Sequence, residues 1–446
     1  MELSLIVRTT NSFLVYFKFV FALSVAGVGI TWAAGYSAWV GPGIIVALAS
    51  LALSFMGHPF LKSFAFTVWV FAFVAASMVY PGAFMTWLGY DLKGLIVPLI
   101  QIIMFGMGTT LSAADFLRIF KMPWPVFIGF GAQFVIMPLT GLALATVFPF
   151  TKGVAAGVVL IGCCPSGVAS NVMSYLAGGN VALSVTITSC TTLASPLLTP
   201  FLMDRLAGQF VQIEFVKMMF EIVNMIIVPV MAGLIANRLL YGQHKAFQRG
   251  GPLAVVAGAA LLLALGAWRL APAALFHIGQ VAFQKDGMVV GLLLVGVVAM
   301  AKLVVGVLWK GPEDWMDRTL PIVSMGGICC IIAIITARSR DDLMEVGHIV
   351  IGAVMIHNAV GYLLGYGLAR AARLDEPACR TVAFEVGMQN GGMASALAMN
   401  LLKNTQAALA PAIFGPWQNV SGSILATWWR HRPVGGPNPA DPPTGP

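Results

Sequence analysis

Runs of mostly apolar residues, each about 20 residues long, follow one another along this chain, and a helix of that length crosses the roughly 30 Å of hydrocarbon in a bilayer. Hydrophobic residues make up 59% and charged residues 9% of the chain, against about 25% charged residues in an ordinary globular domain. This pattern excludes a soluble enzyme, a nucleic-acid-binding protein and a disordered scaffold. It predicts an all-α protein with fourteen membrane segments, which begin near Asn11, Ala38, Lys62, Leu92, Pro123, Lys152, Asn180, Val216, Pro252, Asp286, Thr319, His348, Pro377 and Thr405.

The basic residues predict how the chain is oriented, because cytoplasmic loops carry an excess of Lys and Arg. With the N-terminus in the cytoplasm, fourteen Lys and Arg fall on the cytoplasmic side and eight on the other. We therefore expect both termini in the cytoplasm. Lys18, Arg269 and Lys302 fall inside apolar runs, where we expect them to snorkel or to pair in peripheral helices. Charged connections such as 338–342 are expected to be turns.

Two of the predicted segments are interrupted at the middle of the bilayer. The sixth carries Pro, Gly, Ser and Asn between Pro165 and Asn171, and the thirteenth carries a similar stretch from Glu385 to Gly392. Non-helical backbone is tolerated at that depth only where it lines a cavity or is buried in protein. A matched pair of interrupted segments in the two halves of a chain is typical of the binding site of a transporter.

The order of the segments predicts an inverted repeat. Segments three to seven form one repeat, and segments eight and eleven to fourteen form the other. Because each repeat has an odd number of spans, the second enters the membrane upside down, and the two interrupted segments run antiparallel. The sequence fragments of the two repeats are weakly similar: Gln133-Phe134 precedes Pro138 in the first repeat, as His357-Asn358 precedes Tyr362 in the second. The predicted fold is a ten-helix, five-plus-five core with two crossing discontinuous helices, and segments one, two, nine and ten are accessory helices.

Glu385 is the one acid that we expect at mid-membrane depth. Burying a carboxylate there costs at least about 3 kcal/mol, and neither interrupted segment offers a Lys or Arg beside it. Its partner is therefore a cation or a proton. Nearby hydroxyl, amide and backbone oxygens favour a hard monovalent cation over zinc or copper, and the N-termini of half-helices favour an anionic substrate. Proton coupling through Glu385 and a purely structural polar network stay open.

Five motifs of the chain resemble those of the bile acid:sodium symporter family. The motifs span 106–111, 133–138, 165–200, 385–390 and 417–422, and the resemblance covers about 62–430. It implies ten helices in two inverted repeats, divided into a panel and a core. The segment count adds two accessory helices over 1–61 and a helix pair inserted at about 252–310 to this transport core over 62–430. The Pro- and Gly-rich stretch 431–446 is expected to be a disordered cytoplasmic tail.

The resemblance implies two sodium sites beside the crossing. The first would use Ser170, Asn171, Ser184, Thr188 and Glu385, and the second would use Gln133, Glu385, Gln389 and the backbone carbonyls of Val386 and Met388. The expected substrate contacts are Asn171, Asn390, Ser166 and Thr109. The chain departs from the family's usual motifs at Ser166, Gly391 and Gln418, so the identity of the substrate stays open.

The expected function is a sodium-coupled symporter, not an enzyme, that imports a small organic anion by alternating access across a bacterial inner membrane. Bile-acid-like, pantoate-like and keto-acid substrates are all compatible with the resemblance. The alternatives are a proton-coupled transporter, a sensor of the same fold, and an intramembrane hydrolase with Ser166 as nucleophile and His357 as base. The oligomeric state stays open.

Overall fold

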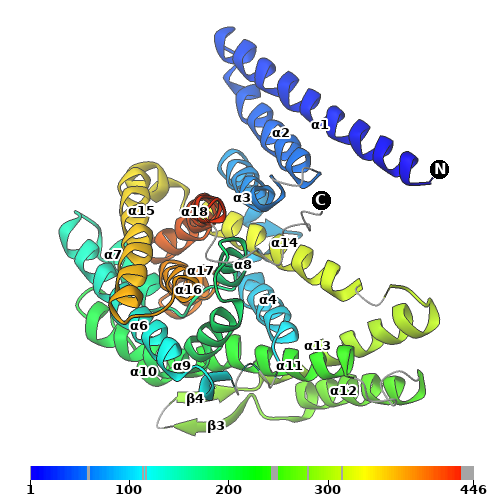
Figure 1. Cartoon of the computed structure of the whole chain (residues 1–446), viewed down its shortest axis with the longest axis vertical. Helices are drawn as coiled ribbons and strands as arrows, with labels where there is room; N and C mark the ends of the chain where they lie inside the picture. The colour runs from blue at the N-terminus through cyan, green and yellow to red at the C-terminus, as the bar shows by residue number, and fades with distance from the viewer. Residues whose placement is uncertain are drawn as a thin grey trace, which may run out of the picture.

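The computed structural model describes residues 2–57, 61–112, 115, 118–242, 250–278, 281–312 and 315–432. The described chain is almost entirely helical (Figure 1). Its α-helices are α1 (Glu2–Ala33), α2 (Ser37–Met56), α3 (Lys62–Val79), α4 (Ile96–Thr110), α6 (Pro123–Val147), α7 (Lys152–Cys163), α8 (Ala169–Leu176), α9 (Val181–Ala207), α10 (Phe215–Ile222), α11 (Val228–Tyr241), α12 (Gly250–Leu270), α13 (Asp286–Ala301), α14 (Trp315–Arg338), α15 (Arg340–Ala371), α16 (Glu376–Gly387), α17 (Gly391–Ala396) and α18 (Thr405–Arg430).

Short elements complete the described chain. Turns of π-helix follow α10, α13 and α17, at Val223–Ile227, Lys302–Leu308 and Leu397–Leu401, and 3₁₀ turns lie at Pro81–Phe84, Leu92–Leu95 and Arg118–Phe120. The strands form two antiparallel hairpins, β1 (Thr86–Trp87) with β2 (Tyr90–Asp91) and β3 (Ala274–Ile278) with β4 (Val281–Gln284). Most of the predicted tail, 433–446, lies outside the described residues.

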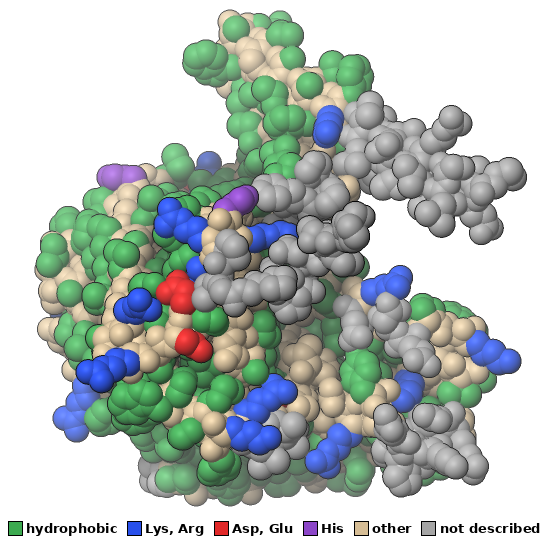
Figure 2. All heavy atoms as spheres, in the orientation of Figure 1, with side chains coloured by type: hydrophobic (Ala, Val, Ile, Leu, Met, Phe, Trp, Pro, Cys, Tyr) green, Lys and Arg blue, Asp and Glu red, His purple; other side chains and the backbone are tan. Residues whose placement is uncertain are grey.

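Each of the fourteen predicted membrane segments corresponds to a helix or to a pair of short helices. Within the described ranges, nine helices are long and apolar enough to cross a bilayer. The sixth and thirteenth segments are each split, into α7 and α8 and into α16 and α17, as their polar interruptions predicted. Hydrophobic side chains cover much of the face shown in Figure 2, and only 22% of the apolar stretch of α12 is buried inside the protein. The exterior therefore suits contact with lipid.

The connection between α14 and α15 differs from the prediction. The charged stretch 338–342 was expected to be a turn, but α14 continues to Arg338 and α15 begins at Arg340, so only Ser339 separates them. Asp341 and Asp342 lie in the first turn of α15, where negative charge stabilises a helix N-terminus. Helix α15 therefore begins about two turns before His348, because its first residues are polar and a hydropathy pattern does not detect them.

An ion pair ties this end of α14 to the β1–β2 hairpin. Arg338 donates to the carboxylate of Asp91, which also accepts from the backbone N–H of Lys93. The Lys93 N–H and the Arg338 guanidinium hold the pKa of the Asp91 carboxyl below its usual value.

The packing and the helix caps show the inverted repeat. Helix α6 packs on α7 and α9, and α15 packs in the same way on α16 and α18. Asn180 begins α9 by accepting from the backbone N–H of Leu183 at 3.0 Å, and Asn404 begins α18 by accepting from that of Ala407 at 3.2 Å. The two repeats therefore use the same residue type at equivalent caps.

We call α3, α4, α10 with α11, and α14 the panel group, and α6, α7 with α8, α9, α15, α16 with α17, and α18 the core group. Helix α4 packs on α11 and α14, and α14 packs on α3, whereas α10 packs mainly on α9 of the core group. Helices α4 and α11 approach so closely that a Cβ on Gly108 would lie 2.2 Å from the Val230 carbonyl oxygen. Such contact between backbones is a common basis of helix packing in lipid.

The four accessory helices lie at the periphery of these groups. The α1–α2 pair packs through α2 on α3 and projects from the body, while α12 and α13 pack on each other and, through α13, on α11 (Figure 1). Lys302, which follows α13, donates from Nζ to the carbonyls of Leu239 and Leu240 at 2.5 and 2.8 Å. It thereby satisfies the C-terminal carbonyls of α11, which is the pairing in a peripheral helix that we expected.

Candidate functional site

The two split helices meet at their breaks, in the middle of the core group. The backbone N–H of Gly167 donates to the Met388 carbonyl, and that of Asn390 donates to the Pro165 carbonyl, both at 2.9 Å. These bonds form an antiparallel bridge between Ser166 and Gln389. Each unwound segment therefore satisfies backbone groups of the other, as backbone at this depth must.

At each break, an amide side chain from the helix that comes before the split helix donates a hydrogen bond to the unwound backbone. Gln133 on α6 donates from Nε2 to the Cys164 carbonyl at 2.8 Å, and Asn358 on α15 donates from Nδ2 to the Gly387 carbonyl at 2.9 Å. Helices α6 and α15 are equivalent in the two repeats, so Gln133 corresponds to Asn358. The sequence fragments had placed Gln133 opposite His357, one residue away.

The residues of the first predicted sodium site come together around Glu385, whose side chain is fully buried. Oxygen Oε1 accepts from the hydroxyls of Ser170 and Ser184 at 2.6 and 2.5 Å, and Oε2 accepts from that of Thr188 at 2.8 Å. The Oδ1 atom of Asn171 lies 2.8 and 3.3 Å from the hydroxyl oxygens of Ser184 and Thr188, so it shares the single proton of each hydroxyl with Glu385. Helices α8, α9 and α16 thus bring these side-chain oxygens to one point. We call these five residues the Glu385 cluster.

The negative charge of this cluster is not balanced by a basic side chain. Among the described residues, none forms a salt bridge with Glu385. Hydroxyl groups satisfy the carboxylate oxygens but leave the net charge in place. Oxygen donors with a single formal charge suit a hard monovalent cation, and a cation would also reduce the cost of burying the carboxylate.

Part of the second predicted sodium site also comes together. The amides of Gln133 and Gln389 are joined by hydrogen bonds of 2.7 and 3.1 Å, and Gln389 also donates to the Val386 carbonyl at 2.6 Å. The Met388 carbonyl already accepts from Gly167, and both carboxylate oxygens of Glu385 accept bonds within the Glu385 cluster. This second group is therefore less complete than the first.

Gln418 on α18 was not among the predicted site residues. Its Oε1 accepts from the backbone N–H of Gln389 at 2.7 Å, and its Nε2 donates to the Gln389 carbonyl at 3.0 Å. It therefore fixes the backbone of the second break from the side. The motif Trp417-Gln418-Asn419 was the available signal, because it places two amides in an apolar run.

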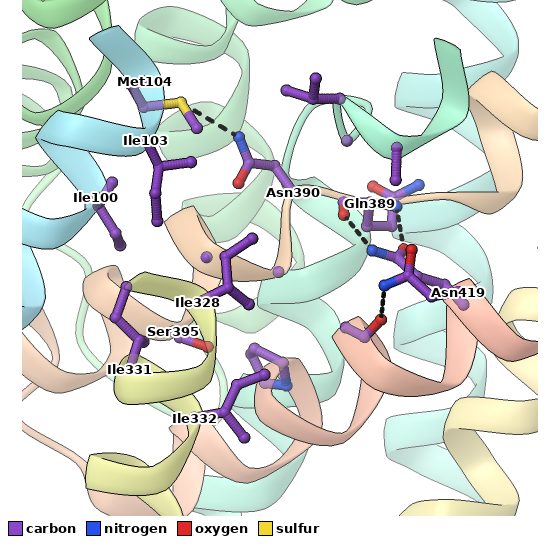
Figure 3. Close-up of a pocket in the computed structure, with 18 of the residues that line it drawn as sticks. Ile100, Ile103, Met104, Ile328, Ile331, Ile332, Gln389, Asn390, Ser395 and Asn419 are labelled. Carbon is purple, nitrogen blue, oxygen red and sulfur yellow. Dashed lines mark hydrogen bonds between the residues drawn. The ribbon is translucent and has the colours of Figure 1, made fainter. Parts of the chain in front are cut away.

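A cavity of about 120 Å³ lies between the panel group and the crossing (Figure 3). Its panel wall is apolar and consists of Phe66, Ile100, Ile103, Met104, Ile328, Ile331 and Ile332. Its core wall includes the breaks, Asn390, Ser395, Gln418 and Asn419. The Nδ2 atom of Asn390 extends across the cavity toward the sulfur of Met104, 3.8 Å away. No charged side chain of the described chain lines this cavity.

The four predicted substrate residues lie in different places. Asn390 lines the cavity, whereas Asn171 belongs to the Glu385 cluster. Ser166 donates to the Glu385 carbonyl at 2.8 Å. Thr109 donates to the Gly106 carbonyl at 2.7 Å and lies on α4 beside Asn237 of α11, away from the lining of the cavity.

Ser166 and His357, the nucleophile and base of the hydrolase alternative, each bond to a backbone carbonyl. The hydroxyl of Ser166 donates to the Glu385 carbonyl, and the Nε2 atom of His357 pairs with the Met137 carbonyl at 2.9 Å. A general base has to reach the proton of its nucleophile. The two side chains form no hydrogen bond with each other.

Comparisons with known proteins agree with this geometry. The model of the Sodium Bile acid symporter family matches residues 97–265. The uncharacterized sodium-dependent transporter YocS of Bacillus subtilis is 33% identical over 364 residues, which are 82% of this chain and 90% of that protein. The chain belongs to the sodium bile acid symporter family.

Other members of the sodium bile acid symporter family also match over most of their length. The probable sodium/metabolite cotransporter BASS2 of Oryza sativa is 28% identical over 82% of this chain and 70% of that protein. The ileal sodium/bile acid cotransporter of Homo sapiens is 28% identical over 72% and 74%. Each of these relatives is named as a sodium-dependent transporter or cotransporter. The nine apolar helices of the described ranges agree with a multi-pass membrane protein.

Proposed function

We propose that the protein is a sodium-coupled symporter that imports a small organic anion by alternating access. The Glu385 cluster is the observation that carries the proposal. A fully buried carboxylate with three hydroxyl donors and no basic partner in the described chain is a site that lacks one positive charge. A sodium ion supplies that charge, and the transporter then moves it together with the substrate.

Two sodium ions bind beside the crossing in this proposal. The first binds to the Glu385 cluster, where the hydroxyl oxygens turn their lone pairs toward the ion. The second binds near Gln133, Gln389 and the Val386 carbonyl, with Met388 and Glu385 completing its ligands. Both sites touch the breaks, so occupied sites hold the two unwound segments in the positions that bind substrate. The core group, 123–207 and 340–430, then moves against the panel group.

The substrate binds in the cavity between the two groups. Its apolar wall accommodates a hydrocarbon portion, while the Asn390 amide offers a neutral donor to an anionic group. The volume of about 120 Å³ lies below the roughly 300–1,000 Å³ of sites for drug-sized ligands. It therefore favours a compact pantoate-like or keto-acid anion over a bile-acid-like one.

The free energy that two sodium ions release supports a higher accumulation of the substrate than the free energy that one ion releases. Two sodium ions that move down a tenfold gradient and about 100 mV release about 7 kcal/mol. A monovalent anion that enters against this potential costs about 2.3 kcal/mol. The remaining about 5 kcal/mol sustains an accumulation of several thousandfold, whereas a single sodium ion would leave about 1.4 kcal/mol, or tenfold.

Uptake into proteoliposomes tests this function directly. A thermal-shift screen of organic anions in sodium and in potassium buffer first identifies a substrate. An inward sodium gradient is then expected to drive its uptake, and an inside-negative potential is expected to accelerate it, because two sodium ions and one monovalent anion carry net positive charge inward. Uptake driven only by a proton gradient would assign the coupling to protonation of Glu385. Binding without uptake under any gradient would assign the chain to the sensor class.

Ser170→Ala and Thr188→Ala each remove one hydroxyl from the Glu385 cluster. A hydrogen bond to a charged group contributes about 1.5–3 kcal/mol, so we expect the sodium concentration for half-maximal uptake to rise about ten- to a hundredfold. The maximal rate at saturating sodium should change much less. Ser189→Ala is the matched control. Ser189 lies on α9, as Thr188 does, but its hydroxyl donates to the Val185 carbonyl at 2.7 Å. An unchanged sodium dependence in both variants would remove these hydroxyls from the ion site.

A further inference from the structure

A second cavity of about 720 Å³ lies between α15 and α18, and its lining shares no residue with the cavity at the crossing. We call it the α15–α18 groove. It is lined from Met355 to Tyr366 on α15 and from Trp417 to Trp429 on α18. At 1.5 Å per helical residue it is roughly 17 Å long, which is close to half of the roughly 30 Å thickness of the hydrocarbon layer. One membrane leaflet therefore matches its length.

The groove opens sideways, toward lipid. Leu363, Ile424 and Trp428 on its rim are 70, 57 and 48% exposed. Two polar groups in its floor are bonded within the protein: the Ser421 hydroxyl donates to Asn358 Oδ1 at 2.6 Å, and the Tyr362 hydroxyl donates to the Gln418 carbonyl at 3.2 Å. The indole N–H of Trp417 is buried and has no hydrogen-bond partner within the described chain. The free lining is thus aliphatic and aromatic, which suits a hydrocarbon chain better than a polar solute.

Arginines stand at the end of the groove where both helices terminate. The guanidinium of Arg432 lies 4.0 Å from the ring centre of Trp428, which is itself part of the lining. Arg370, at the end of α15, makes only a loose contact of 3.9 Å with Glu376, whose carboxylate accepts from the lining residue Tyr366 at 2.7 Å. Both sides of the groove therefore end in an arginine that can contact an anionic group.

Arg380 lies nearby but has a different role. It is buried, and it donates to the carbonyls of Ala177, Trp429 and Arg432 at 2.8, 3.2 and 2.8 Å. These bonds hold the ends of α8 and α18 together and fix the backbone of Arg432. The positions of the exposed arginines thus follow from the fold. Lys and Arg also clearly outnumber Asp and Glu on the face shown in Figure 2.

We propose that the α15–α18 groove binds one anionic phospholipid, with an acyl chain between the helices and the phosphate against Arg370 and Arg432. Basic residues at the cytoplasmic ends of membrane helices bind anionic headgroups in this way. The residues that follow Arg432 are a poor alternative occupant, because 433–446 consist mostly of proline, glycine and polar residues and contain no Leu, Ile, Met or aromatic side chain. The proposal is independent of the proposed transport.

Lipid titration of the full-length protein in detergent, followed by native mass spectrometry, tests the site. Dioleoyl phosphatidylglycerol and dioleoyl phosphatidylcholine have the same chains but different headgroup charge. We expect the anionic lipid to bind more tightly, and Arg370→Gln or Arg432→Gln to weaken its binding about fivefold each. Ala359→Phe fills the exposed floor of the groove and is expected to weaken both lipids at least about tenfold.

Two control variants separate this site from general contact with lipid. Arg205→Gln removes an arginine that stacks 5.6 Å from Phe201 at the end of α9, where the lining of the groove does not extend. Leu139→Phe enlarges a side chain on α6 that is 54% exposed. Both should bind the two lipids as the wild type does. Equal affinity of the wild type for the two lipids, or wild-type binding by both arginine variants, would overturn the proposal. A dimer that Ala359→Phe dissociates would assign the groove to a second copy of the chain and overturn it equally.

Discussion

Glu385→Gln is expected to abolish sodium-driven uptake. The substitution keeps the size of the side chain, but it turns one acceptor oxygen into an NH2 donor and removes the only negative charge of the Glu385 cluster. Removing one member of a buried charge pair costs about 3–5 kcal/mol, so sodium affinity should fall by at least about a hundredfold. At an ordinary sodium gradient the variant would then transport at background level.

Thermal unfolding in sodium and in potassium buffer measures the same effect without a transport assay. Ligand at a hundred times its dissociation constant stabilises a protein by about 2.7 kcal/mol, so the wild type should melt at a higher temperature in sodium. The variant should lose this difference without unfolding, because an uncompensated charge has been removed from the interior. Glu221→Gln is the control, since Glu221 lies on α10 in the panel group. Sodium-dependent uptake by Glu385→Gln at the wild-type rate would refute the assignment of the ion site.

The membrane segments and their breaks could be predicted from the sequence, because both depend on the cost of polar groups in lipid. Apolar runs identified the fourteen segments, and the glycines and polar residues in the middle of two of these runs identified the two split helices. Helix ends beyond the bilayer could not be predicted in this way. Residues 340–342 are charged and were therefore assigned to a turn, whereas Leu343 and Val346, which follow them, pack against the core, so the early start of α15 depends on packing and not on hydropathy.

The Glu385 cluster could also be predicted, since a mid-membrane carboxylate requires partners and the nearby hydroxyls supply them. The supporting contacts of Gln418 and Asn358 could not, because they join segments whose relative register is set only by the crossing. For Thr109 the sequence predicted a substrate contact, but the residue does not line the cavity. Its motif placed a hydroxyl on α4, but that hydroxyl is satisfied by its own helix, and the residue lies next to the close contact between α4 and α11.

Gly167→Ala tests whether the backbone contact between the two breaks is needed, without changing any charge. An added Cβ would lie 2.6 Å from the carbonyl oxygen of Gln389 and 3.1 Å from its carbonyl carbon. These are backbone atoms that are held by Gln418 and by the bridge itself, so they cannot move aside as a flexible side chain could. We expect the two breaks to separate, uptake to fall at least about a hundredfold, and the protein to be destabilised by about 1–3 kcal/mol.

Two glycines of the same cavity provide matched controls. Gly415→Ala places its Cβ in open space, and Gly392→Ala places it 3.7 Å from the nearest atom, the Asn390 amide oxygen. Each variant narrows the cavity by one methyl group but displaces no backbone, so its uptake should fall far less than that of Gly167→Ala. An equal loss in Gly415→Ala would mean that space in the cavity, and not contact between the breaks, limits transport. Normal uptake by a folded Gly167→Ala protein would mean that the ion sites form without the bridge. Because Glu385→Gln removes the charge and Gly167→Ala displaces the backbone, loss of uptake in both would show that coupling requires the ion and the crossing together.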